Sequence, residues 1–288
     1  MDTTIDSKIC ISSLKNFSPF SNIEVDLLRL DLIHEKISGN KWFKLKPFLT
    51  QAQLLKKDTL MTMGGARSNH LYATAFAAKC IGLKSEGFVR GTWNENQLSS
   101  TLSFCKKNGM TLKFVSAEVY KNLREHQPST ADHALWIPEG GESAMAEAAC
   151  SEINELIPEK YTHIAASVGT GTTAIGIGKS LKAHQQLIGF APMKNGQYLK
   201  EKIAKRIGKN ASQFEFNDQW HLGGFGKRTD ALHNFYQDFL IRFQIELDLV
   251  YTAKMMFGIE QMLHSKYWPS GSKILAIHTG GIQGNAPF

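Results

Sequence analysis

The chain of 288 residues has few of the features that mark metal sites, membrane spans or disordered tracts. Its four cysteines are isolated, with no C-x-x-C pair and no histidine at zinc-ligand spacing, so we predict no metal site. Only 8 prolines occur, and no low-complexity tract argues for disorder. No apolar run approaches the ~20 residues of a membrane-spanning helix, and the first residues lack a basic and then apolar signal. We therefore expect a cytoplasmic protein with reduced cysteines and no membrane partner.

Charge of one sign is also not concentrated anywhere. The formal net charge is +7, but no run of five or more Lys and Arg residues appears, which disfavours a nucleic-acid partner. A hydrophobic content of 42% and a charged content of 20% are typical of an ordered globular protein. The length suits one large domain or two lobes, and we expect two lobes.

Short apolar strands alternate with helical patterns along most of the chain, which is typical of a parallel sheet covered by helices. The first series runs from a strand at 60–63 through a helix at 69–79 to a strand at 111–115. The second series begins with a strand at 162–168 and ends with a strand at 273–278. The pattern predicts the α/β class. Two further predicted helices are Ser143 to about Leu156 and Asp230 to Ile245.

One lysine, Lys41, follows a Gly-Asn turn at the start of an amphipathic stretch, where an amine can be held still. Most lysines are solvated, and Lys36, Lys44 and Lys46 are rivals nearby. An amine that forms a Schiff base also needs a fixed cofactor beside it. Lys41 becomes a candidate only together with two glycine-rich loops further along the chain.

The later of these loops follows the strand at 162–168 and precedes a helical pattern. Backbone N–H groups and a helix N-terminus would then point at one spot and attract a phosphate. No lysine stands at the P-loop position, and the third glycine of the dinucleotide pattern is missing, which disfavours nucleoside triphosphates and NAD. A tight turn capped by Gly and Thr is the alternative. The loop is Gly169-Thr170-Gly171-Thr172-Thr173.

The earlier loop is Gly64-Gly65 followed by Ser68-Asn69-His70, at the start of the helix predicted at 69–79. Hydroxyl, amide and free backbone donors at such a position can hold a carboxylate. An ordinary N-cap is the alternative, since Ser and Asn are common caps.

In this order the motifs resemble those of the pyridoxal-phosphate (PLP) enzymes of the tryptophan-synthase-β fold, in the branch of D-cysteine desulfhydrase and aminocyclopropane carboxylate deaminase. The resemblance implies a two-lobed, parallel-sheet, three-layer sandwich and a homodimer. Residues 1–46 and 140–288 would form a large PLP-binding domain, and residues 47–139 a small α/β domain. The motifs that carry it are Gly39-Asn40-Lys41 with Lys44-Leu45 after it, Gly64-Gly65 with Ser68-Asn69-His70, the loop from Gly169 to Thr173, and Val250-Tyr251-Thr252 with His278-Thr279-Gly280-Gly281.

The resemblance also implies roles for these residues. Lys41 would hold PLP covalently, Asn69 would face its phenolic oxygen, and Thr279 would lie beside the pyridine nitrogen. A hydroxyl partner leaves that nitrogen largely unprotonated, which makes the cofactor a milder electron sink. Tyr251 would lie over the active site, although a core tyrosine is the alternative. Ser68 is a further catalytic candidate. Ser68, Asn69 and His70 would surround the substrate carboxylate, and Gly169, Thr170, Gly171, Thr172 and Thr173 would bind the phosphate.

At three positions this chain differs from residues that are usual in one or both branches of the family, and these differences bear on the reaction. The deaminase branch is similar in having Glu and Leu where this chain has Thr252 and Thr279, which favours the desulfhydrase reaction. The family usually has Tyr at the position of Phe225. Removal of a Cα proton by Lys41 or Tyr251 and loss of a β-substituent would convert D-cysteine to pyruvate, ammonia and hydrogen sulfide. The alternatives are an aminocyclopropane carboxylate deaminase, a lyase for other β-substituted amino acids, a degenerate PLP-binding protein, and a non-PLP enzyme or phosphate-binding module.

Overall fold

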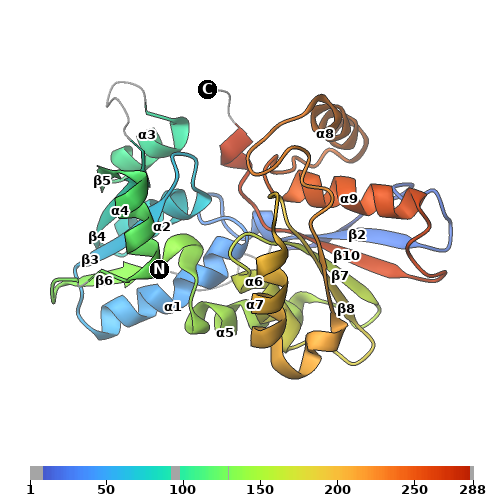
Figure 1. The fold of residues 1–288 in the computed structure, drawn as a ribbon, viewed down its shortest axis with the longest axis horizontal. Coiled ribbons are helices and arrows are strands. Elements are labelled where there is room, and N and C mark those ends of the chain that lie inside the picture. The colour runs from blue at the N-terminus through green and yellow to red at the C-terminus, as the bar shows by residue number, and fades with distance from the viewer. Residues whose placement is uncertain (1–8, 92–97, 129, 286–288) are drawn as a thin grey trace.

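The strands form two sheets that lie side by side in the computed structural model (Figure 1), which describes residues 9–91, 98–128 and 130–285. Six strands have the order β1-β2-β10-β7-β8-β9, and four have the order β5-β4-β3-β6. Apart from the antiparallel pair β1 and β2, the strand pairs of the described residues are parallel. The predicted α/β class is confirmed. The strands are β1 (Ile11–Ser13), β2 (Glu24–Arg29), β3 (Thr59–Gly64), β4 (Lys84–Arg90), β5 (Met110–Val115), β6 (Ala134–Ile137), β7 (His163–Ser167), β8 (Gln186–Phe190), β9 (Phe214–Asn217) and β10 (Lys273–His278).

Helices cover both faces of the six-stranded sheet, which gives this lobe three layers (Figure 1). In β10, Leu275 and Ile277 face the core shared with α5, α6 and α7, whereas Ile274 and Ala276 face the core shared with α8 and α9. A strand that is apolar on both faces is typical of a parallel sheet between two helical layers. The α-helices are α1 (Asn40–Leu54), α2 (Asn69–Cys80), α3 (Ser100–Lys107), α4 (Ala117–Glu125), α5 (Ala144–Ser151), α6 (Thr172–Lys179), α7 (Gln197–Ile207), α8 (Asp230–Phe243) and α9 (Thr252–His264).

The four-stranded sheet is also covered on two sides. Leu71 of α2 and Leu102 of α3 belong to one apolar cluster, and Tyr120 of α4 belongs to another with Trp136 of β6. The helix α1 packs against α5 of one lobe and α2 of the other, so it joins the two. The proposed domain boundary between residues 46 and 47 falls inside α1, and the division into domains stays a prediction.

Two predicted helices differ from the observed ones at their ends. The helix predicted to reach Leu156 leaves α-helical geometry after Ser151 and continues as a tighter 3-10 segment, η4 (Glu152–Leu156). There Asn154 donates to the carbonyl oxygens of Ser151 and Ile177, which fixes the tightened turn against α6. The helix predicted to reach Ile245 ends at Phe243, because Gln244 adopts the left-handed conformation that terminates helices.

The described residues contain neither a membrane-spanning helix nor a metal cluster. None of their helices is long and apolar enough to cross a bilayer. In the same part of the chain, no group of three or more His, Cys, Asp or Glu side chains could hold a metal ion.

Candidate active site

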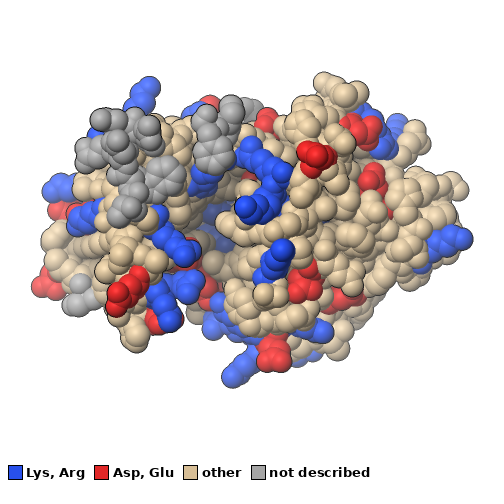
Figure 2. Space-filling view, turned by 45° about the horizontal axis from the view of Figure 1, so that its top comes forward, with Lys and Arg blue, Asp and Glu red and all other residues tan. Residues whose placement is uncertain are grey.

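The predicted motifs meet between the lobes. Four of them follow the carboxyl ends of parallel strands, which is where open α/β sheets place their ligands, and Tyr251 immediately precedes α9. The start of α1 follows β2 and a short 3-10 turn, Ser68 follows β3, the loop at 169–173 follows β7, and Thr279 follows β10. Figure 2 shows the surface hollowed between the two lobes, with lysine and arginine side chains around the hollow.

The Gly-Asn turn before Lys41 is locked against the end of β10. Gly39 has φ +64°, and a Cβ atom on it would lie 1.9 Å from the carbonyl oxygen of Thr279. The N–H of Asn40 also donates to that oxygen, at 3.4 Å. Only glycine combines a left-handed conformation with so close an approach, so the start of α1 and the residue after β10 hold each other in place.

Two hydrogen bonds connect Lys41 to the loop at 169–173. The Nζ of Lys41 donates to Asn40 Oδ1 at 2.8 Å, and Asn40 Nδ2 donates to Thr173 Oγ1 at 2.9 Å. Asn40 is buried, so this bridge is shielded from water. The amine and the glycine loop, 132 residues apart in the chain, are therefore neighbours in space.

The environment of Lys41 favours a neutral amine. Burial, and then the charge of Lys44, lower the pKa of Lys41 to about 7, while the carboxyl of Asp248 acts in the opposite direction. An amine with a pKa near neutrality has an appreciable unprotonated fraction at pH 7 and can serve as nucleophile or base. Among the four candidate lysines, Lys41 is the one that Asn40 connects to the loop at 169–173.

Two glycines let the loop at 169–173 pack closely against neighbouring side chains. A Cβ atom on Gly169 would lie 3.2 Å from the ring of Tyr251, and one on Gly171, which has φ +93°, would lie 2.9 Å from Ile203. The Thr170 and Thr172 hydroxyls contact each other at 2.9 Å. Helix α6 begins at Thr172, so its first N–H groups point at this loop. These donors suit a phosphate group.

A second lysine, Lys44, lies one turn further along α1. Its side chain is 5% exposed, and the described residues give it no hydrogen bond or ion pair. Burial is the main cause of its lowered pKa, with Cys150 and Glu142 acting in the opposite direction. Sequence reasoning treated Lys44 as a rival of Lys41 and as part of the first motif, but gave it no role of its own. Its spacing of three residues from Lys41, on the same face of a helix, is the signal that could have paired them.

Ser68 and Asn69 form the start of α2, as predicted. The hydroxyl of Ser68 accepts from the N–H of Leu71 at 3.2 Å, which is the geometry of an N-cap. The Asn69 Oδ1 accepts from Gln283 at 2.7 Å, which leaves Nδ2 as the free end of the amide. A Cβ atom on Gly281 would lie 2.3 Å from that nitrogen. The cap does not use the Ser68 proton, so the hydroxyl keeps a donor.

His70 is oriented by a buried chain of hydrogen bonds. The Thr62 hydroxyl donates to the carbonyl oxygen of Ile137 at 2.8 Å, so it accepts from Nε2–H of His70, also at 2.8 Å. Nδ1 is then an acceptor, and it has no partner among the described residues. Burial, with the charges of Lys41 and Lys44, holds the pKa of His70 well below its usual range. The neutral ring has no donor left for a carboxylate, so only the backbone N–H of His70 is suited to that role.

Tyr251 lies against the glycine loop with Phe225 beside it. The Phe225 ring meets the Tyr251 ring edge-on, with centroids 5.8 Å apart, and is 58% exposed. Burial, Asp248 and Glu139 all raise the pKa of the Tyr251 phenol above its ordinary value. This phenol stays protonated at neutral pH, so it can donate a proton but is a poor base. Between the two predicted bases, the pKa values favour Lys41.

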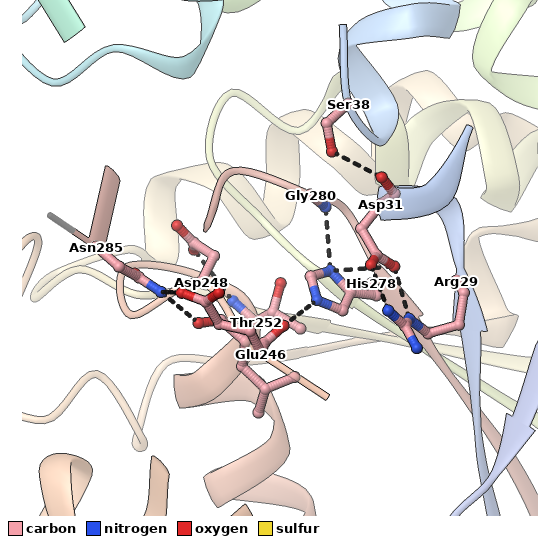
Figure 3. A network of polar contacts seen from close by, with 10 residues as sticks. Arg29, Asp31, Ser38, Glu246, Asp248, Thr252, His278, Gly280 and Asn285 are labelled. Carbon is pink, nitrogen blue, oxygen red and sulfur yellow. Dashed lines mark hydrogen bonds and ion pairs between the residues drawn. The ribbon is translucent and has the colours of Figure 1, made fainter. Parts of the chain in front are cut away.

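A buried polar network holds the turn after β10 (Figure 3). The Nε2–H of His278 donates to the carbonyl oxygen of Glu246 at 2.8 Å, and its Nδ1 accepts from the N–H of Gly280 at 3.2 Å. The same figure shows Asp248, whose Oδ1 accepts from the backbone of Tyr251 and Thr252. Burial raises the pKa of Asp248 to about 7. Sequence reasoning missed Asp248, which lies four residues before the first residue of α9 and accepts from N–H groups at the start of that helix.

No family model matches the chain. It is 29% identical to a Pyrococcus furiosus protein named "Putative 1-aminocyclopropane-1-carboxylate deaminase", over 95% of this chain and 89% of that protein. It is 27% identical to the mitochondrial bifunctional D-cysteine desulfhydrase/1-aminocyclopropane-1-carboxylate deaminase of Arabidopsis thaliana, over 91% of this chain and 73% of that protein. A crystal structure described as an ACC deaminase homologue matches with a TM-score of 0.83 and 27% identity, over 98% of this chain and 91% of the other. The chain is a homologue of these deaminase and desulfhydrase proteins.

The likeness extends to the fold of more distant PLP enzymes. A fungal L-serine ammonia-lyase from Rhizomucor miehei matches with a TM-score of 0.67 at 13% identity, over 95% of this chain and 93% of the other. At that identity the match concerns the fold alone. The predicted fold family is confirmed, and enzymes of the deaminase and desulfhydrase family depend on PLP.

The residues between the lobes fit this cofactor. The backbone N–H groups at the start of α6 point at the loop, and the buried Lys44 supplies positive charge without a partner in the described structure. Lys41 supplies an amine with a pKa of about 7. At Thr279 the side chain is buried at the end of β10, and Thr252 offers a second hydroxyl whose Oγ1 has no partner among the described residues.

Proposed function

We propose that the protein is a PLP-dependent lyase that removes a β-substituent and the amino group from a small amino acid, with D-cysteine as the substrate. The products would be pyruvate, ammonia and hydrogen sulfide. The observation that carries the proposal is Lys41, an amine of lowered pKa that a buried asparagine connects to the loop at 169–173. The homologues named above support the same class of reaction. We further propose that the enzyme is a homodimer, in line with the family resemblance, and that it works in the cytoplasm.

Each part of the cofactor has a counterpart in the site. The backbone N–H groups of residues 169–173 and the charge of Lys44 would hold the phosphate, and Lys41 would hold the aldehyde carbon. The free Nδ2 of Asn69 would donate to the phenolic oxygen, and Thr279 would lie beside the pyridine nitrogen. When bound, PLP accepts the electrons that are released at the α-carbon of an amino acid.

The protein groups divide the proton transfers between them. Lys41, released when the substrate amine replaces it, would take the α-proton, because its pKa lies near neutrality. Tyr251 keeps its proton at this pH and could donate it to the departing group. Ser68 retains a hydroxyl donor, and the backbone N–H groups of Asn69 and His70 are placed at the start of α2, where a substrate carboxylate would be favoured.

The test is a visible spectrum and a substrate panel on the purified protein. We expect a visible absorbance band of the bound cofactor and release of pyruvate from D-cysteine. Lys41→Ala should abolish both, whereas Lys46→Ala, an exposed lysine of the same helix, should keep both. A protein that stays colourless after incubation with PLP would contradict the proposal.

The second candidate is an aminocyclopropane carboxylate deaminase. The name of the Pyrococcus furiosus relative favours it, whereas the residues Thr252 and Thr279 favour the desulfhydrase. A faster release of 2-oxobutyrate from the cyclopropane amino acid than of pyruvate from D-cysteine would reverse our preference. A cofactor band without release of either keto acid would instead favour a degenerate family member, which is the alternative that Phe225 raises.

A further inference from the structure

A buried lysine outside the proposed chemistry, Lys254, holds the loop that carries Phe225. Lys254 lies on the first turn of α9 and is 2% exposed. Its Nζ donates to the carbonyl oxygen of His221 at 2.8 Å and to that of Gly224 at 2.6 Å. Burial lowers the pKa of Lys254 to about 8, so the amine is mostly protonated at pH 7 and both bonds are charge-assisted.

The two carbonyl groups mark two successive turns of the loop. The N–H of Gly224 donates to the His221 carbonyl, and the N–H of Lys227 donates to the Gly224 carbonyl, each at 3.1 Å. Both acceptors therefore bind one loop amide and the same ammonium group. Three glycines and Leu222 have positive φ values here, from +47° to +110°, so the backbone alone does not prefer this shape strongly. The buried ammonium group of Lys254, which binds both turns, compensates for the conformational freedom of this backbone.

Phe225 lies between the two turns, and its partner immediately precedes the helix that provides Lys254. The Phe225 ring meets the ring of Tyr251, three residues before Lys254, and Tyr251 in turn lies against Gly169. After Phe225, Arg228 donates to the carbonyl oxygens of Gly284 and Asn285, which fixes the far end of the loop. The loop is thus bound to the large lobe at both ends.

We propose that Lys254 is a positioning residue. It holds the loop 221–228 rigid at the edge of the active site and places the Phe225 ring against Tyr251. Without this lysine, a loop so rich in glycine would be free to move over the active site. The effect on substrate binding rests on the proposed function, whereas the effect on the loop itself does not.

The experiment compares Lys254→Met, which keeps the length of the side chain and removes the ammonium, with Lys254→Gln, which keeps one short donor. Hydrogen exchange followed by mass spectrometry would report on the amides of Gly224 and Lys227 in the peptide covering 221–229. We expect exchange there to be faster by roughly tenfold or more in Lys254→Met and by less in Lys254→Gln, because a charged hydrogen-bond donor is lost. Lys200→Met, on the exposed face of α7, should exchange there like the wild type.

Steady-state kinetics supply the second measurement. We expect KM for the amino acid to rise by roughly tenfold in Lys254→Met while kcat and the cofactor band change little, since the wall is loosened but the reacting groups remain. Phe225→Ala should raise KM similarly without faster exchange, because its tether is intact. Wild-type exchange in both Lys254 variants would overturn the proposal. So would faster exchange spread evenly over the molecule, which would make Lys254 a general stabilising residue. If the wild type lacks turnover, the proposed function fails, but the exchange result still decides the role of Lys254.

Discussion

On the side where Lys41 lies, the site consists of backbone segments that interlock, whereas on the side of Phe225 it is bounded by a ring that is 58% exposed. Gly39 touches the carbonyl of Thr279, and Asn40 binds Thr173, so three segments distant in sequence fix one another. Around Phe225 a side chain could change size or polarity without displacing the backbone. We therefore expect cofactor binding to depend on the fold itself and substrate choice to depend on a few side chains that can be replaced without moving the backbone.

The largest effect on cofactor binding and stability is expected from a substitution at Gly39, where the backbone segments are in closest contact. In Gly39→Ala, the added Cβ would meet the Thr279 oxygen at 1.9 Å, so the turn must move and carry Lys41 away from the loop at 169–173. Left-handed strain adds roughly 1–3 kcal/mol. We expect the visible cofactor band to be lost and the midpoint of thermal unfolding to fall by roughly 5–10 °C.

Gly82→Ala is the matched control for this change. Gly82 has φ +73°, close to that of Gly39, but a Cβ atom there would meet nothing within 4 Å. It should cost roughly 1–2 kcal/mol from backbone strain alone and keep the band. If Gly39→Ala behaved like Gly82→Ala in both measurements, the close contact with Thr279 would have no role in placing Lys41.

Structural features that depend on neighbours in the chain could be predicted from sequence, whereas features that depend on distant contacts could not. The apolar runs of β7 and β10 and the helix after Ser68 were predictable because period and capping residues depend on neighbours in the chain. The antiparallel strand β1 and the helix α4 were not assigned, since three residues give no period and α4 is mostly exposed. The early end of α5 depends on a contact of Asn154 with α6, which no local pattern contains.

For the site, the glycine motifs were informative because close backbone contact requires glycine wherever it occurs. Asp248 was missed, and Lys44 was given no role of its own, because their importance comes from burial beside Lys41. A sequence does not show which charged side chains lose contact with water. The tautomer of His70 likewise depends on Thr62, eight residues earlier, and on a carbonyl of β6. The roles of the individual site residues stay predictions that the following experiments address.

A smaller effect concerns the pH dependence of cofactor capture. Because the pKa of Lys41 is lowered to about 7, the rate at which cofactor-free protein develops the visible band should rise with pH up to about 7 and then level off. Asp248 raises the pKa of Lys41, so Asp248→Asn should move this midpoint to lower pH by less than about one unit while keeping an oxygen for the helix cap. Stopped-flow absorbance would measure the midpoint.

Asp238→Asn serves as the control, since Asp238 is an exposed partner of Arg242 on α8 and should leave the midpoint unchanged. A midpoint near pH 10 in the wild type would mean that Lys41 is an ordinary solvated lysine. A shift to higher pH in Asp248→Asn would contradict the sign of the interaction and remove Asp248 from the site.

The smallest effect is expected on the replaceable side, at Phe225. In Phe225→Tyr, the added hydroxyl would start from a ring that is already 58% exposed, so it can stay in contact with water and should not change stability or the cofactor band measurably. One added neutral hydrogen bond to a bound substrate is worth about 0.5–1.5 kcal/mol, so the ratio of kcat/KM for D-cysteine to that for the cyclopropane amino acid should change by roughly two- to tenfold. Tyr198→Phe, which alters an exposed phenol on α7, should leave the ratio unchanged. A changed ratio with an unaltered cofactor band would mean that this ring controls substrate preference. A lost band with an unaltered ratio would mean instead that Phe225 takes part in cofactor binding.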